Sequence, residues 1–493
     1  MGEYFIIYLV MVDDGGYMPE RRIKDHPVLE FERGKEFYFD FEGKKVKAYE
    51  GETIASALYA DGLRKFTESK LLERPRGFFC AIGKCSSCIM SVDGIPHTRT
   101  CVVLAKEGMK VENQGARPDF PSVEVEKGKR LEKDIGIAIV GGGPAGLTAA
   151  ITAAEQGVDV HLFDEGDKLG GQLVKQTHQF FGSHTEDAGV RGIHIAGELI
   201  EKAQELGVTF HNGSTVLGFY PERTISVEHD NRFEIYNTEG IIYATGAIEN
   251  FLAFENNDLP GVYGAGGVQT LMNEQGIVPG EKVLMIGSGN VGVIVSYQLI
   301  QAGVDVVEVV EALPEIGGYQ VHASKLRRAG VPLNTRHTIK KALGDEKVEG
   351  AIVQEIDENW QPIEGTEREV DCDVICIAVG LHPDNEFLRQ AGCEMEYVRE
   401  LGGYVPKRTE NMRTTAERVY VAGDSAGIEE ATVAALEGKI AGAALTEEIH
   451  GSSKELEKKK EEAKKSLEQM RMGPYGEAPR QGVKMCTVDE EVC

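Results

Sequence analysis

The sequence predicts an α/β protein in which two βαβ domains follow a smaller β-rich domain. Two stretches, residues 135–163 and 282–310, each read as strand, glycine-rich turn, helix and strand, which is the pattern of a βαβ unit. Two short strand-like runs, residues 37–41 and 45–49, precede both units and are separated by a glycine-containing turn. The length of 493 residues fits about three domains of ordinary size.

Composition argues against several partners and locations. The formal net charge is −27 at pH 7, so the chain repels phosphate backbones and nucleic acid is not expected as a partner. The most apolar run, residues 4–12, is far shorter than the ~20 residues of a membrane-spanning helix. Acidic residues flank this run where a signal peptide would carry basic residues and a cleavage site, so we expect a cytoplasmic protein. In that reducing compartment, clustered cysteines indicate a metal site more often than a disulfide.

The β-rich domain is expected to contain a capped helix and a cysteine-bearing loop. After the two strands, Thr53 can cap a short helix whose apolar residues recur with helical spacing. The cysteines follow this helix. Residues 116–133 contain prolines and alternating charges, which indicates a linker to the first βαβ unit.

Four cysteines in this domain have the spacing of an iron–sulfur site. Cys80, Cys85 and Cys88 form a C-x4-C-x2-C motif, and Cys101 follows after a short hairpin. This is the plant-type [2Fe–2S] spacing, in which four thiolates hold the cluster. A structural zinc site is an alternative, but zinc favours two separate cysteine pairs far apart in the chain. The sequence therefore predicts a [2Fe–2S] cluster, with zinc or an unloaded site as the alternatives.

The first βαβ unit carries a dinucleotide-binding fingerprint. Gly141, Gly143 and Gly146 form G-x-G-x-x-G between an apolar strand and a helix. The first glycine makes the turn, the second lets the backbone approach a pyrophosphate, and the third lets helix and strand pack closely. The phosphates then bind at the helix N-terminus, on free N–H groups and the positive end of the helix dipole. Asp164 ends the next strand, where it can accept hydrogen bonds from an adenosine ribose.

The second unit repeats this Rossmann pattern. Gly287, Gly289 and Gly292 form the glycine motif, and Glu311 ends the following strand. A carboxylate at that position repels a 2′-phosphate, so NAD is favoured over NADP. The alternative is a Rossmann unit kept only as scaffold, because a fold alone does not establish binding.

Taken together, these motifs resemble the flavoproteins with two dinucleotide-binding domains of the glutathione-reductase type. Residues 244–247 and 378–380 are similar to that family's two crossover segments, and residues 414–424 are similar to its late flavin motif. The resemblance implies FAD at the first site, with Asp424 on its ribityl chain. Unlike the dithiol reductases of that family, the chain has no C-x-x-C beside either nucleotide motif. The further cofactor contacts that the resemblance implies are Pro144, Ala145, Glu165, Gly171, Gln172, Val216, Thr245, Gly246 and Gly423.

The segments around the cysteines narrow the resemblance. Residues 21–29, 51–55, 74–77 and 99–101 are similar to the ferredoxin-like segment of the alpha subunits of sarcosine oxidase, hydrogen cyanide synthase, opine oxidase and dye-linked L-proline dehydrogenase. The overall arrangement is most similar to the archaeal dye-linked L-proline dehydrogenases. This resemblance implies an electron-transferring alpha subunit whose partner, a flavoprotein beta subunit, holds its own FAD and oxidises an amino acid. It also implies FMN at a subunit interface and an external electron acceptor.

Two other functions fit the same motifs. One is a self-sufficient NADH:acceptor oxidoreductase, in which hydride passes from NADH at the Gly287 site to FAD at the Gly141 site. The other is a structural or regulatory subunit, because the first fingerprint recognises only the ADP half that FAD, NAD and ATP share. ATP or another adenine nucleotide could then occupy that site. We expect no substrate acid or base in this chain, since His178 and His322 are most simply structural.

The C-terminal tail is expected to be a charged helix, in which Ser452 and Glu455 are spaced as a capping box. The domains predicted from all these motifs are a ferredoxin-like β-grasp domain (20–120), an adenine-nucleotide domain in two pieces (134–252 and 372–450), a NAD-binding-like domain (253–371) and the tail (451–493).

Overall fold

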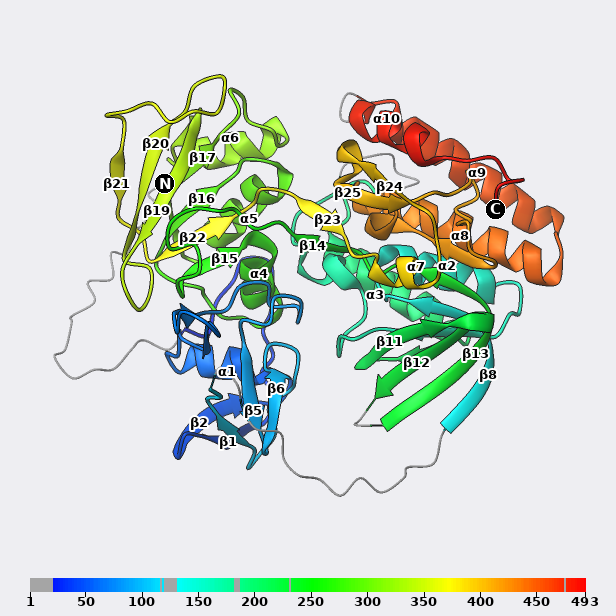
Figure 1. Ribbon diagram of the computed structural model, residues 1–493, viewed down its shortest axis with the longest axis horizontal. Coiled ribbons are helices and arrows are strands. Elements are labelled where there is room, and N and C mark those ends of the chain that lie inside the picture. The colour runs from blue at the N-terminus through cyan, green and yellow to red at the C-terminus, as the bar shows by residue number, and fades with distance from the viewer. Residues whose placement is uncertain (1–20, 116–117, 119–130, 181–186, 230–231, 474–475) are drawn as a thin grey trace, which may run out of the picture.

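The computed structural model describes residues 21–115, 118, 131–180, 187–229, 232–473 and 476–493. The apolar run at residues 4–12 and residues 119–130 of the expected linker lie outside this description. Residues 131–133, also expected in the linker, are instead the start of a long strand. Figure 1 shows the described chain as three sheet-based units and a helical tail.

The N-terminal unit, residues 21–115, is a five-stranded sheet with one helix. Its elements are β1 (Glu36–Phe41), β2 (Lys44–Tyr49), α1 (Ile54–Ala60), β3 (Thr67–Glu68), β4 (Pro75–Arg76), β5 (Ile89–Val92), β6 (Ile95–Arg99) and β7 (Lys110–Glu112). β1 and β2 form the expected antiparallel hairpin, and β1 pairs in parallel with β7, giving the order β2-β1-β7-β5-β6. Alternate residues such as Phe37 and Phe39 are buried in one core with the residues of α1. Thr53 caps α1 by accepting a hydrogen bond from the Ser56 N–H, as predicted.

The first nucleotide unit is a mixed sheet packed against helices. Its elements are β8 (Leu131–Val140), α2 (Pro144–Ala154), β9 (Val160–Phe163), α3 (Gly192–Glu205), β10 (Thr209–His211), β11 (Ser214–Tyr220), β12 (Thr224–His229), β13 (Arg232–Tyr243), β26 (Val419–Val421) and α8 (Ala431–His450). Parallel pairing gives the order β10-β9-β8-β13, with β26 on the far side of β13. Small residues bring α2 and α8 together: a Cβ added at Gly438 would lie 2.1 Å from the Ala145 oxygen.

The second nucleotide unit repeats this architecture. Its elements are β15 (Val262–Gly264), α4 (Ala265–Gln269), β16 (Lys282–Ile286), α5 (Asn290–Gln301), β17 (Asp305–Glu311), α6 (Gln320–Arg328), β18 (Leu333–Thr335), β19 (His337–Leu343), β20 (Gly350–Glu355), β21 (Arg368–Val370) and β22 (Val374–Ile377). A parallel sheet has the order β15-β22-β16-β17-β18, and β19, β20 and β21 form a separate antiparallel sheet. The β22 residues are buried throughout, as expected for a parallel strand covered on both faces.

Two chain crossings join the nucleotide units. They are the short strands β14 (Ala247–Glu249) and β23 (Leu381–Pro383), which pair antiparallel and begin at the ends of the two segments expected as crossovers, 244–247 and 378–380. In Figure 1 these strands lie between the two halves of the molecule. The chain therefore leaves the first unit and returns to it at one place.

The C-terminal part adds a small hairpin and helices. Its elements are α7 (Glu386–Gln390), β24 (Met395–Val398), β25 (Gly403–Pro406), α9 (Lys454–Arg471) and α10 (Glu477–Cys486). The helix cap lies one residue later than predicted: Ser453, and not Ser452, accepts the Leu456 N–H at the start of α9. No helix in the part of the chain that the structure covers is both long and apolar enough to span a membrane.

Candidate cluster and nucleotide sites

The four predicted cluster cysteines form two hydrogen-bonded pairs, Cys80 with Cys85 and Cys88 with Cys101. Only Cys85 is partly exposed, and the other three are buried. Among the residues placed by the structure, no group of three or more His, Cys, Asp or Glu side chains is arranged to hold one metal ion. Two pairs of thiols fit a two-iron cluster, in which each iron takes two protein ligands, better than a single tetrahedral zinc.

The backbone of the cysteine loop turns N–H groups toward these thiols. Gly83 donates to Cys101 Sγ at 3.2 Å, and Cys85 donates to Cys80 Sγ at 3.4 Å. The loop achieves this with Ala81 and Gly83 in the left-handed region, at φ 56° and 74°. A hydrogen bond from the Cys80 thiol lowers the pKa of Cys85 to about 5, and the pKa of Cys80 is raised in turn. N–H donors and a low thiol pKa both favour the thiolate that a metal ligand must be.

The cysteine loop is also held against the second nucleotide unit. The Phe79 oxygen accepts the Gly264 N–H at 3.2 Å, just before α4. A Cβ added at Gly267 would lie 2.1 Å from that same oxygen, so only glycine allows this approach. Nearby, the Arg74 guanidinium binds the Asp258 carboxylate through contacts of 2.7, 2.9 and 3.1 Å. These contacts fix the cluster loop on one side.

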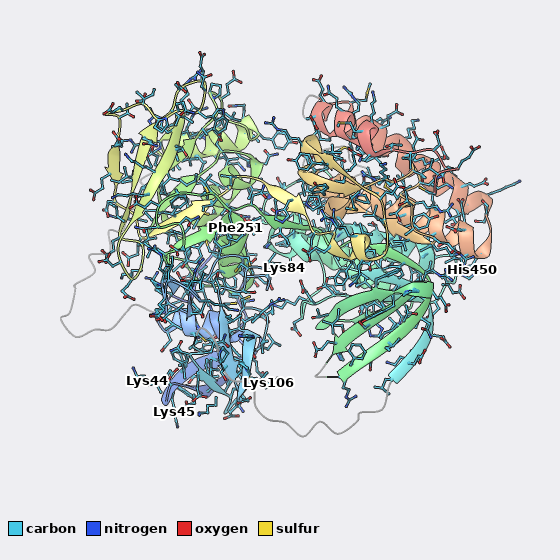
Figure 2. All side chains as sticks on the ribbon, in the orientation of Figure 1. Lys44, Lys45, Lys84, Lys106, Phe251 and His450 are labelled. Carbon is cyan, nitrogen blue, oxygen red and sulfur yellow. The ribbon has the colours of Figure 1, made fainter. Side chains whose placement is uncertain are left out.

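Lys84 ties the same loop to the first nucleotide unit. Its Nζ lies 2.9 Å from Glu165 Oε1 and 3.0 Å from Asp384 Oδ2, and Figure 2 labels it where the two halves of the molecule meet. Burial lowers the pKa of Lys84, but the two carboxylates outweigh burial and hold it above its ordinary value. Glu165, which the resemblance assigned to the nucleotide, has its carboxylate engaged by this lysine. The role of Lys84 was not predicted, because its partners Glu165 and Asp384 are far from it in the sequence.

The first glycine turn has the steric demands that its fingerprint implies. Gly141 has φ +107°, and a Cβ there would lie 2.2 Å from the Ala244 oxygen. A Cβ at Gly146 would lie 1.8 Å from the Gly141 oxygen. At Gly143, by contrast, the Cβ direction is open except for the Gly171 Cα at 3.9 Å. That opening lies at the start of α2, where a pyrophosphate could meet free N–H groups, so the residues fit an adenine dinucleotide.

Asp164 is fixed beside this turn. Its Oδ2 accepts the Gly142 N–H at 2.6 Å and its Oδ1 accepts the Gly166 N–H at 2.7 Å. Burial raises the pKa of Asp164, and the two N–H donors partly offset that rise. Each carboxylate oxygen keeps a second lone pair, which is the capacity that ribose hydroxyls need.

Two further segments, residues 245–246 and 423–425 (below, the late segments), converge on the same glycine turn. Gly246 donates its N–H to Ser425 Oγ at 2.9 Å, and Thr245 Oγ1 donates to the Asp384 oxygen at 2.5 Å. A Cβ at Gly423 would lie 2.9 Å from the Ala145 side chain at the start of α2. Residues from three distant segments thus meet at one helix end, and Ser425 is a member that the sequence did not reveal.

Asp424 is the acid predicted to bind a ribityl chain. It is partly buried, and this burial raises its pKa to about 7. Its Oδ1 accepts only a long hydrogen bond, 3.4 Å, from the Glu429 N–H. An acid buried with so little local support fits a partner hydroxyl that the protein itself does not supply.

Two predicted contacts are placed less centrally. Gln172 is exposed beside Gly171, and Val216 is buried in β11 with Val227 as its register partner on β12. Pro144 lies in the first turn of α2, behind the cap Gly143. Among the predicted contacts that the structure describes, direct contacts join the first glycine turn and α2 to Asp164, Gly171 and the late segments.

The second turn is built like the first. A Cβ at Gly287 would lie 2.2 Å from the Ala378 oxygen, one at Gly292 would lie 2.1 Å from the Gly287 oxygen, and Gly289 faces open space. Glu311 Oε2 accepts the Ser288 N–H at 2.7 Å, as Asp164 accepts Gly142. Each glycine turn also accepts one backbone hydrogen bond from a later glycine. The Gly170 N–H donates to the Gly142 oxygen, and the Gly318 N–H donates to the Ser288 oxygen, each at 2.8 Å.

A buried ion network supports the late segment from behind. Glu437 Oε2 accepts the Gly423 N–H at 3.0 Å, while its Oε1 accepts from Arg471 Nη2 at 2.7 Å. Arg408 Nη2 lies 3.6 Å from the same oxygen. Glu437 and Arg408 are almost wholly buried, so each charge depends on the others. The sequence predicted a charged helix for the tail that carries Arg471 but did not reveal this contact with Glu437.

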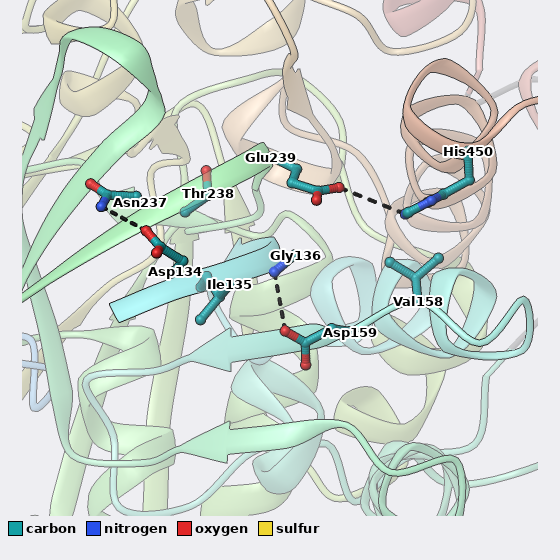
Figure 3. Close-up of a pocket in the computed structure, with 9 residues that line it drawn as sticks. All are labelled: Asp134, Ile135, Gly136, Val158, Asp159, Asn237, Thr238, Glu239 and His450. Atoms are coloured by element: carbon teal, nitrogen blue, oxygen red, sulfur yellow. Dashed lines mark hydrogen bonds and ion pairs between the residues drawn. The ribbon is translucent and has the colours of Figure 1, made fainter. Parts of the chain in front are cut away.

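A cavity of about 450 Å³ lies away from these sites, at the end of the parallel sheet opposite the glycine turn (Figure 3). Its polar groups pair with each other: Asn237 donates to Asp134 at 2.9 Å, and the Gly136 N–H donates to Asp159 at 3.1 Å. Dinucleotides bind at the carboxyl ends of parallel strands, so this cavity is not the nucleotide site. It is lined by Asp134, Ile135, Gly136, Val158, Asp159, Asn237, Thr238, Glu239 and His450.

Two family matches cover most of the chain. Residues 136–438 match the pyridine nucleotide-disulphide oxidoreductase family, and residues 34–116 match a 2Fe-2S iron-sulfur cluster binding domain. The matches indicate FAD or NAD(P) binding and a 2Fe-2S cluster. They confirm the predicted fold class.

Curated relatives are about a quarter identical to this chain over the residues that align. The alpha subunit of sarcosine oxidase from Corynebacterium sp. (strain P-1) is 26% identical over 77% of this chain and 41% of that protein. An opine oxidase subunit from Rhizobium meliloti (strain 1021) is 27% identical over 62% of this chain and 69% of its own length. The chain thus spans about two fifths of the sarcosine oxidase protein, and these relatives are subunits of oxidases.

Solved structures show the same architecture. L-proline dehydrogenase from P. horikoshii is 28% identical, with a TM-score of 0.66 over 89% of this chain and 79% of that chain. Thioredoxin reductase from T. acidophilum shares the fold at 22% identity, with a TM-score of 0.53 over 64% of this chain and 98% of that chain.

Proposed function

Because this chain belongs to the pyridine nucleotide-disulphide oxidoreductase family, we propose that it is the electron-transferring, nucleotide-binding subunit of a flavin-dependent amino-acid dehydrogenase. In this proposal a flavoprotein beta subunit oxidises the CH–NH bond of the substrate, with L-proline first among the substrates to be tested. Electrons leave through an external acceptor, and FMN at the subunit interface is part of the proposed route. The first nucleotide site holds FAD or another adenine nucleotide.

One observation carries this proposal. The four-thiol pocket is fixed directly to the first nucleotide site, through Lys84 to Glu165 and Asp384. A cluster held against a nucleotide site is suited to passing electrons, since transfer between redox groups requires that they stay close. The relatives support the setting, because they are oxidase subunits and an L-proline dehydrogenase.

A second function, an NADH:acceptor oxidoreductase, is favoured by a different observation. The second turn keeps the same close glycine contacts as the first, and Glu311 is held by the Ser288 N–H and Oγ, both at 2.7 Å. A fixed carboxylate there suits the ribose of NAD rather than a 2′-phosphate. Both functions use the same two sites and differ in the source of the electrons.

The test starts from the chain purified alone and from the chain co-expressed with a candidate amine-oxidase-type beta subunit of the same source. Released cofactors are identified by chromatography, and iron and sulfide are measured. Dye reduction is then followed with L-proline, with sarcosine and with NADH as electron donors.

We expect the chain alone to carry iron and sulfide and to leave L-proline unoxidised, and the complex to oxidise it. Bleaching of the lone chain by NADH would instead establish the oxidoreductase function. ATP or ADP released without flavin, together with substrate oxidation only in the complex, would make the first site a structural or regulatory one. A complex that oxidises none of the amines tested would overturn the proposed dehydrogenase.

A further inference from the structure

The cluster loop contains one charged side chain between its first two cysteines, that of Lys84. The residues on both sides of it touch the thiols: the Gly83 N–H donates to Cys101 Sγ and the Cys85 N–H donates to Cys80 Sγ. Any shift of the Lys84 backbone therefore moves groups that contact the sulfurs. This lysine is part of the cluster's immediate surroundings.

The side chain of Lys84 ends in the other site. Glu165, 2.9 Å from its Nζ, directly follows the ribose acid Asp164. Asp384, 3.0 Å from its Nζ, donates its own N–H to the Gly246 oxygen at 3.0 Å. The two carboxylates thus belong to two different segments beside the first glycine turn, and one ammonium group joins them to the cysteine loop.

The charges at this junction are sheltered enough to interact. The side chain of Lys84 is 28% exposed, that of Asp384 is 15% exposed and that of Glu165 is 36% exposed. Fully exposed ion pairs contribute little because water and salt screen them. Partly buried charges that share one partner are screened less, so a change in charge at the cluster is felt at the carboxylates.

We propose that Lys84 is the positioning residue that couples the cluster to the first nucleotide site, holding the loop in place and linking the two sites electrostatically. This inference rests on the proposed function only in taking the thiols to hold a cluster and the glycine turn to hold a nucleotide. It requires neither a particular substrate nor a beta subunit. The cluster gains one negative charge on reduction, so a fixed positive charge beside it favours the reduced form.

Opposite changes at this junction then have opposite effects. Lys84→Met removes the positive charge while keeping the length of the side chain, so we expect the midpoint potential of the cluster to fall. Asp384→Asn keeps the lysine but removes one counter-charge, so the potential is expected to rise. A purely structural contact would not produce shifts of opposite sign. Lys84→Arg retains the charge and is expected to restore the wild-type potential in large part.

The nucleotide side has its own readout. Without Lys84, the carboxylates of Glu165 and Asp384 lose their shared positive partner and repel an anionic nucleotide at the first site. We expect ADP to bind Lys84→Met about fivefold more weakly or worse, the lower end of coupling between linked sites. ADP is the probe because the fingerprint recognises this part of FAD, NAD and ATP alike.

The experiment uses the full chain loaded with iron and sulfide. Cluster assembly is checked by the EPR signal after dithionite reduction, the midpoint potential is measured by an EPR-monitored redox titration, and ADP binding is measured by calorimetry. Lys45→Met is the matched control, because Lys45 is an exposed lysine of the same unit on the β1–β2 hairpin (Figure 2). It should leave both the potential and ADP affinity unchanged.

The coupling is overturned if Lys84→Met behaves like Lys45→Met in both measurements, or if Lys84→Met and Asp384→Asn shift the potential in the same direction. If Lys84→Met fails to assemble a cluster, Asp384→Asn decides: a higher potential supports the coupling and an unchanged one refutes it. None of these readouts needs substrate oxidation. A failed dehydrogenase assay therefore refutes the proposed function and leaves this result standing.

Discussion

An iron–sulfur cluster and a zinc ion at the two thiol pairs differ in metal content, sulfide content and spectrum. Cys85 is the partly exposed member of its pair and has a lowered thiol pKa, which makes it a ready ligand. We expect Cys85→Ser to lose most of the visible absorption and the EPR signal of the reduced chain. Iron and sulfide content should fall with them, since the four thiolates hold the cluster together.

The matched control is Cys493→Ser, because Cys493 is also partly exposed but lies outside the loop. It should retain iron and sulfide at the wild-type level. A wild-type chain that binds zinc stoichiometrically and no sulfide would contradict the iron–sulfur assignment at these residues.

The raised pKa of Asp424 implies that the stability of the folded chain depends on pH. Its pKa in the folded chain is about 7, whereas an aspartate in an unfolded chain titrates near about 3.9. Between about pH 4 and pH 7 the folded state therefore holds the extra proton, so stability falls as pH rises through this window. Asp424→Asn, which is uncharged at every pH, should flatten that decline in the melting temperature of the cofactor-free chain.

The control for this change is Asp167→Asn, at an exposed position three residues after Asp164. It should keep the wild-type slope of melting temperature against pH. Equal slopes in Asp424→Asn and the wild type would show that Asp424 is ionised in the folded chain well below pH 7.

The two glycine turns can be tested separately as elements. A Cβ at Gly146 or Gly292 would lie 1.8 or 2.1 Å from a backbone oxygen of its own turn, so either helix must move away from its strand. We expect Gly146→Ala to abolish ADP-type binding at the first site alone and Gly292→Ala to abolish NADH binding at the second alone. Equilibrium binding of ADP and NADH to each variant measures this.

Gly197→Ala is the control, because a Cβ at Gly197 in α3 meets nothing within 4 Å. It should bind both nucleotides normally and be about 0.5–1 kcal/mol more stable, the usual gain from replacing glycine within a helix. Normal ADP binding by Gly146→Ala would show that the first turn does not carry a nucleotide.

Elements were predictable where local sequence determines local contacts. The glycine turns, their acids and the Thr53 cap were found because each depends on residues close together in the chain. Gly317 and Gly318 beside the second turn were not predicted, although they follow Glu311 by six and seven residues, as Gly170 and Gly171 follow Asp164. The start of β8 was missed because Leu131 and the polar residues after it form a strand only by pairing with β13.

At the scale of the whole molecule, the cluster unit shares a buried apolar core with the second nucleotide unit, and polar contacts add to this docking. Arg74 holds Asp258 through three contacts and also donates to Asn256 at 2.9 Å. We expect Arg74→Met to weaken this docking by about 1–3 kcal/mol, as for hydrogen bonds to charged groups. Hydrogen exchange should then quicken at the Gly264 amide, which donates to the Phe79 oxygen across the same interface.

Lys65→Met is the matched control, because Lys65 forms its ion pair with Glu68 in the same unit and both side chains are exposed. Exchange at Gly264 should stay at the wild-type rate in this variant. An unchanged rate in Arg74→Met would mean that Arg74 does not contribute to the docking of the cluster unit.

Sequence reasoning found the fold and the separate sites but not how they are joined. Lys84 and Asp384 are 300 residues apart in the chain, and their pairing exists only once three units are assembled. The same holds for Arg471 and Glu437. Side chains of this kind carry no motif, because their chemistry is set by a distant partner rather than by their neighbours.

The position of Arg471 determines how small a working nucleotide-binding fragment can be. The family match ends at residue 438, yet Glu437 shares its buried charge with an arginine at the end of α9. A fragment trimmed to the family boundary would leave that carboxylate with Arg408 but without Arg471, and removing one partner from a buried ion network typically destabilises by about 3–5 kcal/mol. The smallest autonomous unit for the first site therefore extends through α9.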